Sequence, residues 1–289
     1  MKKLHSFFAG SWAWMFLLTT LIPVAAMAQK GEGELRLEQP KNTTVEQIIQ
    51  KFAAKEKEFK EAREQYTWQQ SVTVQSFDGG TVDGEYRQVS NILFDDKGRR
   101  IEQVTFAPQN TLQHFSMSPE DFEDIQKRLP FVLTSDEIPE YDINYAGQQK
   151  EDELNTYVFD VKPKKLEKGK RYFQGRIWVD DTDFQIVKTY GKNVPDIKSK
   201  GNENLFPNFT TWRELIDGKY WFPTYTKIDD DLHFSTGDQH IRQIVKYTNY
   251  KRFGANVKIT YEGLDINKDN KDTKDKKDQK DQTPPPQKP

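Results

Sequence analysis

The sequence of 289 residues contains no cysteine. Disulfide bridges, thiolate metal sites, cysteine nucleophiles and a lipid-modified N-terminal cysteine are therefore excluded. Histidine is almost as scarce, because the chain has four and one of them, His5, lies in the N-terminal segment 1–28. The residue types that most often bind metals or activate nucleophiles are thus nearly missing.

An excess of one charge is also missing. The chain has 43 Lys and Arg against 45 Asp and Glu, a formal net charge of −2. A surface that binds nucleic acid needs a concentrated basic face, so nucleic acid is not expected as a partner. A glycine-rich phosphate loop, a serine in a nucleophile elbow and a His-x-x-x-His helix are absent as well. We therefore expect no enzyme activity and no cofactor.

One pair of histidines could still cooperate. If Thr236-Gly237 forms a hairpin turn, His233 and His240 lie opposite each other, with the acids at 229–231 and Asp238 nearby. Two imidazoles and a carboxylate could hold a metal ion, which would make a metal-dependent enzyme the alternative. The acids are more simply interpreted as polar loop residues, so no metal site is predicted.

The N-terminal residues 1–28 have the form of a secretory signal. Lys2 and Lys3 precede an apolar stretch at 7–24, and the segment ends in Ala-Met-Ala, a small-x-small cleavage site. We expect cleavage after Ala28 and export to the periplasm. An uncleaved membrane anchor is the alternative, since about 20 apolar residues can span a bilayer.

The C-terminal residues 267–289 consist almost entirely of Lys, Asp, Gln, Thr and Pro. Such a segment buries too little apolar surface to offset chain entropy, so it is predicted to be a disordered tail. It serves as a solvated spacer or, alternatively, as a tether to peptidoglycan or a partner. A linker at 29–42 and one folded domain at 43–266 complete the expected organisation.

One strong helix is predicted over residues 43–66. Thr43 and Glu46 fit a capping box, and the polar face carries charges of mixed sign, which is not typical of a membrane-surface helix. Its apolar stripe must pack against a sheet. The stripe consists of Val45, Ile48, Ile49, Phe52, Phe59, Ala62 and Tyr66.

Alternating apolar segments between Asp-, Gly- and Pro-containing turns predict an antiparallel meander. Three strands are expected over 67–106, with turns at 78–80 and 96–98. A short helix capped by Ser118 and ended by Pro130 follows, as a lid, a plug or a surface crossover. Further strands, closing at 257–261, are expected near Ile143, Tyr157, Ile177, Ile186, Trp212, Phe222, Phe234 and Val245.

About eleven strands fit one curled sheet better than two sandwiches. The chain has 19 Phe, 12 Tyr and 6 Trp, and several strands carry large apolar side chains at both parities. Either a second layer covers such a sheet or the sheet curls around something apolar. The polar segment 194–208, which contains two prolines, is the expected long mobile loop.

Three short motifs carry a resemblance to a known family. The hairpin Gly-x-Ile-Trp-Val-Asp at 175–180 and Phe-x-Ile-Val-Lys at 184–188, supported by Tyr-Trp-Phe-Pro at 220–223, resembles the LolA/LolB/RseB-like superfamily of periplasmic outer-membrane lipoprotein carriers and lipoprotein-sorting proteins. The likeness covers 43–261. It implies a mainly β (α+β) fold, a single curled antiparallel sheet that forms an unclosed β-barrel of about eleven strands with an amphipathic N-terminal helix and a short helical plug. It also implies an arginine that latches the lid to the barrel, with candidates Arg87, Arg99 and Arg176.

The function that the resemblance implies is that of a periplasmic carrier. Acyl chains of a lipid or lipoprotein would bind reversibly in a hydrophobic concave cavity, with transient membrane contact, for lipoprotein sorting to the outer membrane. An RseB-like sensor or scaffold that binds an envelope protein partner is the alternative. RseB-like proteins carry an additional C-terminal globular domain, whereas order here is expected to stop near residue 266, which favours the carrier.

Strand parity selects the residues expected to line the cavity. The strands that are apolar on both faces commit one face to the outside or to the helix, so the other must line a hollow. A register slip of one residue would exchange Ile177 for Trp178. The predicted lining consists of Tyr157, Phe159, Phe173, Ile177, Val179, Phe222 and Tyr225.

Overall fold

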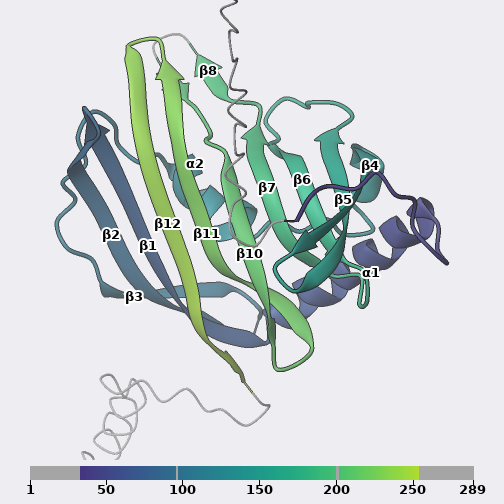
Figure 1. Ribbon diagram of the computed structural model, residues 1–289. Coiled ribbons are helices and arrows are strands. Elements are labelled where there is room, and N and C mark those ends of the chain that lie inside the picture. Colours follow the sequence, from purple (N-terminus) through teal and green to yellow (C-terminus); the bar gives the residue numbers. More distant parts are fainter. Residues whose placement is uncertain (1–32, 96, 200–201, 254–289) are drawn as a thin grey trace, which may run out of the picture.

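The computed structural model of the protein describes residues 33–95, 97–199 and 202–253. Most of them belong to one long antiparallel sheet that curls around helices on its inner side (Figure 1). The strands of this sheet are β1 (Tyr66–Asp78), β2 (Thr81–Phe94), β3 (Arg100–Phe106), β4 (Tyr141–Glu151), β5 (Leu154–Pro163), β6 (Tyr172–Asp180), β7 (Ile186–Val194), β10 (Phe209–Ile216), β11 (Tyr220–Phe234) and β12 (Gly237–Arg252).

The sheet is open. Its ten strands follow the order β3-β2-β1-β12-β11-β10-β7-β6-β5-β4, so β3 and β4 are its edges and do not pair with each other. The predicted fold, a curled and unclosed antiparallel sheet, is therefore confirmed. The predicted strands near Phe222 and Phe234 are one continuous strand, β11, and the described part of the chain contributes ten strands to the sheet. The strand expected at 257–261, the signal and the C-terminal tail lie outside the described residues.

Helix α1 (Val45–Arg63) begins one residue later than the predicted capping box implied. Thr44 is the N-cap: its Oγ1 accepts from the Gln47 amide at 3.2 Å, and Gln47 Oε1 accepts from the Thr44 amide at 3.1 Å. The Thr43–Glu46 box is therefore wrong. Threonine followed three residues later by Glu or Gln occurs in both frames, and the frame with Gln47 is the one whose cap has an extended backbone.

The apolar stripe of α1 packs on the concave face of the sheet, as predicted. Phe52 and Phe59 are almost completely buried. Phe52 meets Phe159 of β5 edge-on at 5.6 Å between ring centroids, and Phe59 meets Phe222 of β11 at 5.5 Å. These contacts join an N-terminal helix to strands more than 100 residues later in the chain.

A second helical segment lies inside the curl. It consists of α2 (Pro119–Glu123) and a turn of π-helix, η1 (Asp124–Arg128), and Ser118 forms the predicted N-cap through a capping box with Asp121. Ile125 and Leu129 are buried in the same core as α1. The segment therefore lies on the concave side of the sheet, and we call residues 118–129 the plug. A 3₁₀ turn, η2 (Ile138–Glu140), leads from it to β4.

The described residues within 194–208 have regular structure that the expected loop did not include. They contain a two-stranded hairpin, β8 (Ile197–Ser199) with β9 (Asn202–Asn204), followed by buried Leu205 and Phe206. Burial of these two side chains against the plug gives the segment a fixed place that its polar composition did not indicate.

The convex face also has a covered patch. Residues 33–39, predicted as part of a linker, run beside β4, where the Gly33 amide donates to Lys150 O at 2.7 Å and the Arg36 amide donates to Gln148 O at 2.8 Å. Leu35 covers a small cluster formed by Val158, Trp178 and Val187. This cluster explains why β5, β6 and β7 are apolar at both parities. None of the helices in the described part of the chain is both long and apolar enough to cross a membrane.

Candidate ligand-binding site

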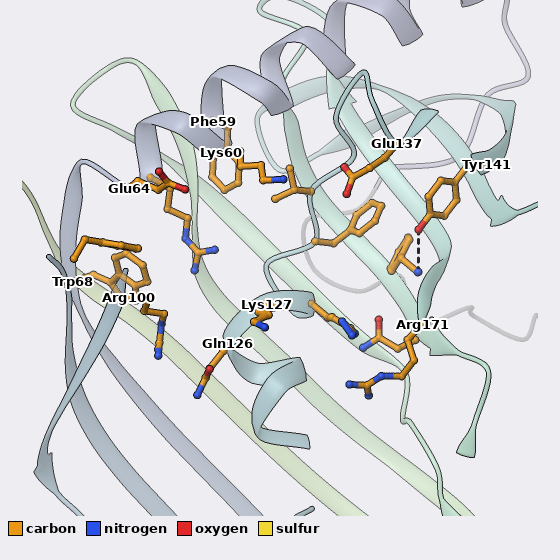
Figure 2. Close-up of a pocket in the computed structure, with 17 residues that line it drawn as sticks. Phe59, Lys60, Glu64, Trp68, Arg100, Gln126, Lys127, Glu137, Tyr141 and Arg171 are labelled. Atoms are coloured by element: carbon orange, nitrogen blue, oxygen red, sulfur yellow. Dashed lines mark hydrogen bonds between the residues drawn. The ribbon is translucent and has the colours of Figure 1, made fainter. Parts of the chain in front are cut away.

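A cavity of about 540 Å³ opens on the concave side between α1 and the plug segment (Figure 2). Its walls come from elements far apart in sequence: the C-terminal half of α1, the starts of β1 and β3, the end of β2, and residues 126–141. Figure 2 shows Trp68 and Arg100 at one end and Tyr141 and Arg171 at the other, with Gln126 and Lys127 below. We call this space the aromatic cavity.

The walls of the aromatic cavity are rich in aromatic rings. Phe131 and Phe173 stack with 4.0 Å between ring centroids, and Trp68 lies 5.8 Å from Phe94. The Tyr141 hydroxyl accepts from the Phe173 amide at 3.3 Å, so this ring is held in place at the rim. Aromatic walls of this kind bind apolar or flat groups through large contact areas.

The same cavity has an excess of positive charge. Two carboxylates, Glu64 and Glu137, line it. Glu137 already accepts from the amide and hydroxyl of Thr134, both at 2.8 Å. The six cations that line the cavity are Lys60, Arg63, Arg100, Lys127, Arg128 and Arg171.

A second cavity, of about 630 Å³, lies on the other side of the plug. Nine of its nineteen lining residues are apolar, and we call this space the apolar cavity. The other ten lining residues are polar, among them Glu120, Asp121 and Gln243. The apolar lining consists of Val74, Phe115, Met117, Ile197, Leu205, Pro207, Leu232, Phe234 and Ile241.

The plug is held between the two cavities by Asp124. Its carboxylate accepts from Asn193 Nδ2 at 2.7 Å and lies 2.8 Å from Arg171 Nη1 and 3.3 Å from Arg128 Nε. Burial raises the pKa of Asp124 to about 6, although Arg171 opposes the rise. At the other end of the plug, Asn204 Nδ2 donates to Ser118 Oγ at 2.7 Å.

A buried ion pair locks α1 to the sheet. Arg213 of β10 donates from Nη1 and Nη2 to the two carboxylate oxygens of Glu56, at 2.6 and 3.1 Å, and both side chains are 1% exposed. Arg213 also donates to the carbonyls of Phe131 and Ile186. Burial raises the pKa of Glu56, and the charge of Arg213 opposes that rise. One arginine thus connects the helix, the sheet and the segment after the plug.

Arg213 is not among the arginines that the resemblance suggested as a latch. Among the candidates, Arg87 and Arg99 have side chains 52% and 73% exposed, and Arg176 pairs with Asp160 at 2.8 Å on the surface. A usable signal existed, because Glu56 lies on the apolar stripe of α1, four residues after Phe52. A carboxylate in that position needs a buried cation.

Six of the seven predicted lining residues face the concave side. They form the packed core beneath α1 and are at most 7% exposed, and only Phe173 among them lines the aromatic cavity. Ile177 lies in this core whereas Trp178 joins the convex cluster, which decides the register. The six are Tyr157, Phe159, Phe173, Ile177, Val179 and Phe222.

Tyr225 is the exception and does not face the concave side. Its ring packs against Trp212 at 5.6 Å, whereas its neighbour Thr226 is buried and shares a 2.8 Å hydrogen bond with Thr211, which in turn donates to Leu129 O of the plug. Thr226 is opposite Thr211 and shares its side, and neighbouring residues of a strand point to opposite faces, so Tyr225 points to the convex side.

The two histidines do not form a common site. In the β11–β12 register His233 is opposite Asp238 and His240 is opposite Asp231, so the two rings are not paired across the ladder. Each contacts its own acid: His233 Nδ1 is 2.9 Å from Asp238, and His240 Nδ1 is 2.7 Å from Asp231. Residues 229–231 are strand, not loop. Within the described ranges, no cluster of His, Asp and Glu suits a metal ion.

Comparison with known proteins gives a likeness of fold alone. No family model and no curated protein matches the chain. A DUF1329 family protein from Desulfovibrio piger is 14% identical, with 67% of this chain and 87% of that chain covered and a TM-score of 0.33. A complex of MucB with MucA(peri) is 10% identical, with 73% of this chain and 99% of that chain covered and a TM-score of 0.21. The Pseudomonas aeruginosa MucA/MucB complex is also 10% identical, with 72% of this chain and 99% of that chain covered and a TM-score of 0.20. The relation to the LolA/LolB/RseB-like superfamily therefore stays a resemblance.

Proposed function

We propose that this chain is a periplasmic carrier that binds the acyl chains of a lipid or lipoprotein on its concave face and serves lipoprotein sorting to the outer membrane. The observation that supports it is the pair of cavities, about 540 and 630 Å³, on either side of the plug. Each volume lies within the range of small-molecule sites in proteins. The proposal assigns binding and release to this chain and no chemical step.

The energetics of such binding suit a carrier. Burying a methylene group contributes about 0.8 kcal/mol, so a few acyl chains give strong binding without any covalent bond or catalytic group. The plug separates the two cavities and is held by polar contacts of Asp124 and Ser118. Displacing it would join the cavities into one groove for a longer chain, and its return would favour release. Transient membrane contact supplies and removes the cargo.

A sensor or scaffold that binds an envelope protein is the second candidate, and a different part of the molecule favours it. Strand β3 forms an edge of the sheet and pairs only with β2 among the described strands. Val104 and Phe106 on this edge are 51% and 46% exposed. An edge with unpaired backbone groups and exposed apolar side chains can accept an added strand from a partner.

Lipid binding separates the two candidates. The protein is purified from its own envelope and examined by native mass spectrometry, and binding of a fluorescent fatty-acyl probe is measured. The carrier should retain lipid and bind the probe. Absence of both lipid and probe binding in the wild-type protein would make the carrier proposal wrong.

A substitution in the apolar cavity sharpens this test. Phe234→Asp places a carboxylate where an acyl chain must exclude water, so probe binding should weaken by about tenfold or more. Leu166→Asp is the matched control, because Leu166 is 50% exposed in the loop before β6 and lines neither cavity. Equal effects of the two substitutions would place the probe elsewhere.

A further inference from the structure

Arg63, the last residue of α1, carries a guanidinium group without an acidic partner. Neither a hydrogen bond nor an ion pair joins it to any residue in the part of the chain that the structure describes, and its Nε is buried. Its guanidinium group lies over the Trp68 ring, whose centroid is 4.7 Å from the guanidinium carbon. Stacking on a ring face leaves the N–H groups at the edge of the guanidinium without acceptors.

Arg100 adds further donors to the same cavity. Its Nη1 donates to Glu102 at 2.7 Å, but Nε and Nη2 are buried and have no acceptor among the described residues. Trp68 Nε1, also buried in this wall, lacks an acceptor too. Burial lowers the pKa of Arg63; Tyr250 and Tyr247 oppose this effect, and the positive charges of Arg100 and Arg213 add to it. Two like charges and several unused N–H groups therefore meet at one end of the aromatic cavity.

The acids nearby do not neutralise this end. Glu56 is engaged by Arg213, and Glu102 accepts from Arg100, Gln88 and Ser90. Glu64, although adjacent in sequence, is exposed to solvent. Arg128 and Arg171 at the other end differ from Arg63, since both contact Asp124. A buried charge without a counter-charge is unfavourable and is rarely kept in a fold without use.

We propose that Arg63, Arg100 and Trp68 form a subsite for the anionic headgroup of an amphiphile, of the phosphate monoester class. The headgroup oxygens accept from the two guanidinium groups and the indole N–H, while the hydrocarbon part lies against the aromatic walls formed by Phe59, Phe131 and Phe173. This inference rests on the proposed function and narrows its ligands to anionic ones.

The test compares two amphiphiles that share a chain and differ in the phosphate. Binding of oleoyl lysophosphatidate and of monooleoylglycerol is measured by titration for the wild type, Arg63→Gln and Arg100→Gln. Arg99→Gln is the control, because Arg99 is exposed and lies outside the cavity. The wild type should bind the lysophosphatidate about tenfold or more tightly than the neutral lipid, and each cavity variant should lose most of that difference. The control should keep it.

A second readout separates a ligand-binding arginine from a structural one. Removing an unpaired, partly buried charge should raise the melting temperature of ligand-free Arg63→Gln, whereas loss of a structural arginine would lower it. A lower melting temperature, or equal wild-type affinity for the two lipids, would overturn the anion subsite and leave the carrier proposal standing.

Inorganic phosphate distinguishes the source of the anion. If phosphate alone raises the wild-type melting temperature, and does so less in Arg63→Gln, while neither lipid binds, the subsite is real and the carrier proposal fails. If neither lipid nor phosphate has an effect, both are wrong.

Discussion

The ion pair between Glu56 and Arg213 shows how one charge can organise three elements. Both side chains are almost completely inaccessible, and Arg213 contacts α1, β7 and the segment after the plug through different N–H groups. A buried pair of this kind contributes little net stability compared with an apolar replacement, because both charges must be removed from water. Removing one partner alone strongly destabilises the fold, since it leaves the other charge buried and uncompensated.

We therefore predict that Glu56→Gln lowers the free energy of unfolding by about 3–5 kcal/mol. The double variant Glu56→Leu/Arg213→Met should recover much of this loss, because it removes both charges and keeps apolar volume. Denaturant unfolding measures the change. Glu58→Gln, which breaks an exposed pair with Lys55, is the control and should leave the midpoint nearly unchanged. A small effect of Glu56→Gln would mean that water reaches the pair.

The carboxyl of Asp124 should give the stability of the protein a recognisable pH dependence. Its pKa is about 6 in the folded protein against a usual value of 3.8, with burial as the main cause. Between about pH 4 and 6 the folded state therefore binds more protons than the unfolded state. The stabilisation that Asp124 contributes is therefore fully present below about pH 4 and is lost as the pH rises through about 6.

Asp124→Asn removes this titration while it keeps the side-chain shape. The melting temperature of the wild type, measured relative to that of the variant, should therefore be higher at pH 4 than at pH 7. Asp160→Asn, at the surface pair with Arg176, is the control. A constant difference across the range would show that Asp124 stays ionised between its arginine neighbours.

At the scale of elements, α1 is the part of the fold that closes the concave side. Its stripe meets β5 through Phe52 and β11 through Phe59. We predict that Phe52→Ala lowers the free energy of unfolding by about 3–5 kcal/mol, since Phe52 is fully buried and its removal leaves a cavity. Lys57→Ala on the exposed side should have little effect. A loss below about 1 kcal/mol, measured by denaturant unfolding, would make α1 peripheral.

The elements themselves could be predicted well from the sequence, because their signals are local. Periodicity placed α1, the short capped helix and most strands within a few residues. The division of β11 into two strands was wrong, since residues 229–231 interrupt the apolar alternation. In the structure these acids are tolerated in a strand by cross-strand partners: Asp229 lies 3.4 Å from Arg242, and His240 contacts Asp231.

The cavities and the charged contacts could not be predicted in the same way. Phe159 and Ile177, which parity assigned to the lining of a hollow, lie in the packed core beneath α1, and parity could not show that α1 would cover them. Which part of a concave face stays hollow depends on the volumes of side chains brought together from distant segments. Arg63 and Arg100 meet only because β3 lies next to β2 and β1 follows α1.

At the scale of the whole molecule, the curled sheet provides a fixed wall and the plug a separable part. The wall is held by long antiparallel ladders, whereas the plug is joined to it by side-chain contacts, through buried Ile125 and Leu129 and through the polar contacts of Asp124 and Ser118. Segments with few contacts open at lower free energy than the sheet around them. The arrangement suits a protein that must admit and release a ligand without unfolding.

The N-terminal segment beside β4 limits how copies of the protein can associate. A sheet with two free edges can add strands in both directions and grow into a fibre. Here the bridge between Arg36 and Gln148, with the contact of Gly33 to Lys150, occupies part of the β4 edge, and β3 is left as the open one. Strand addition is therefore hindered along the covered part of β4, whereas the β3 edge is left open to it.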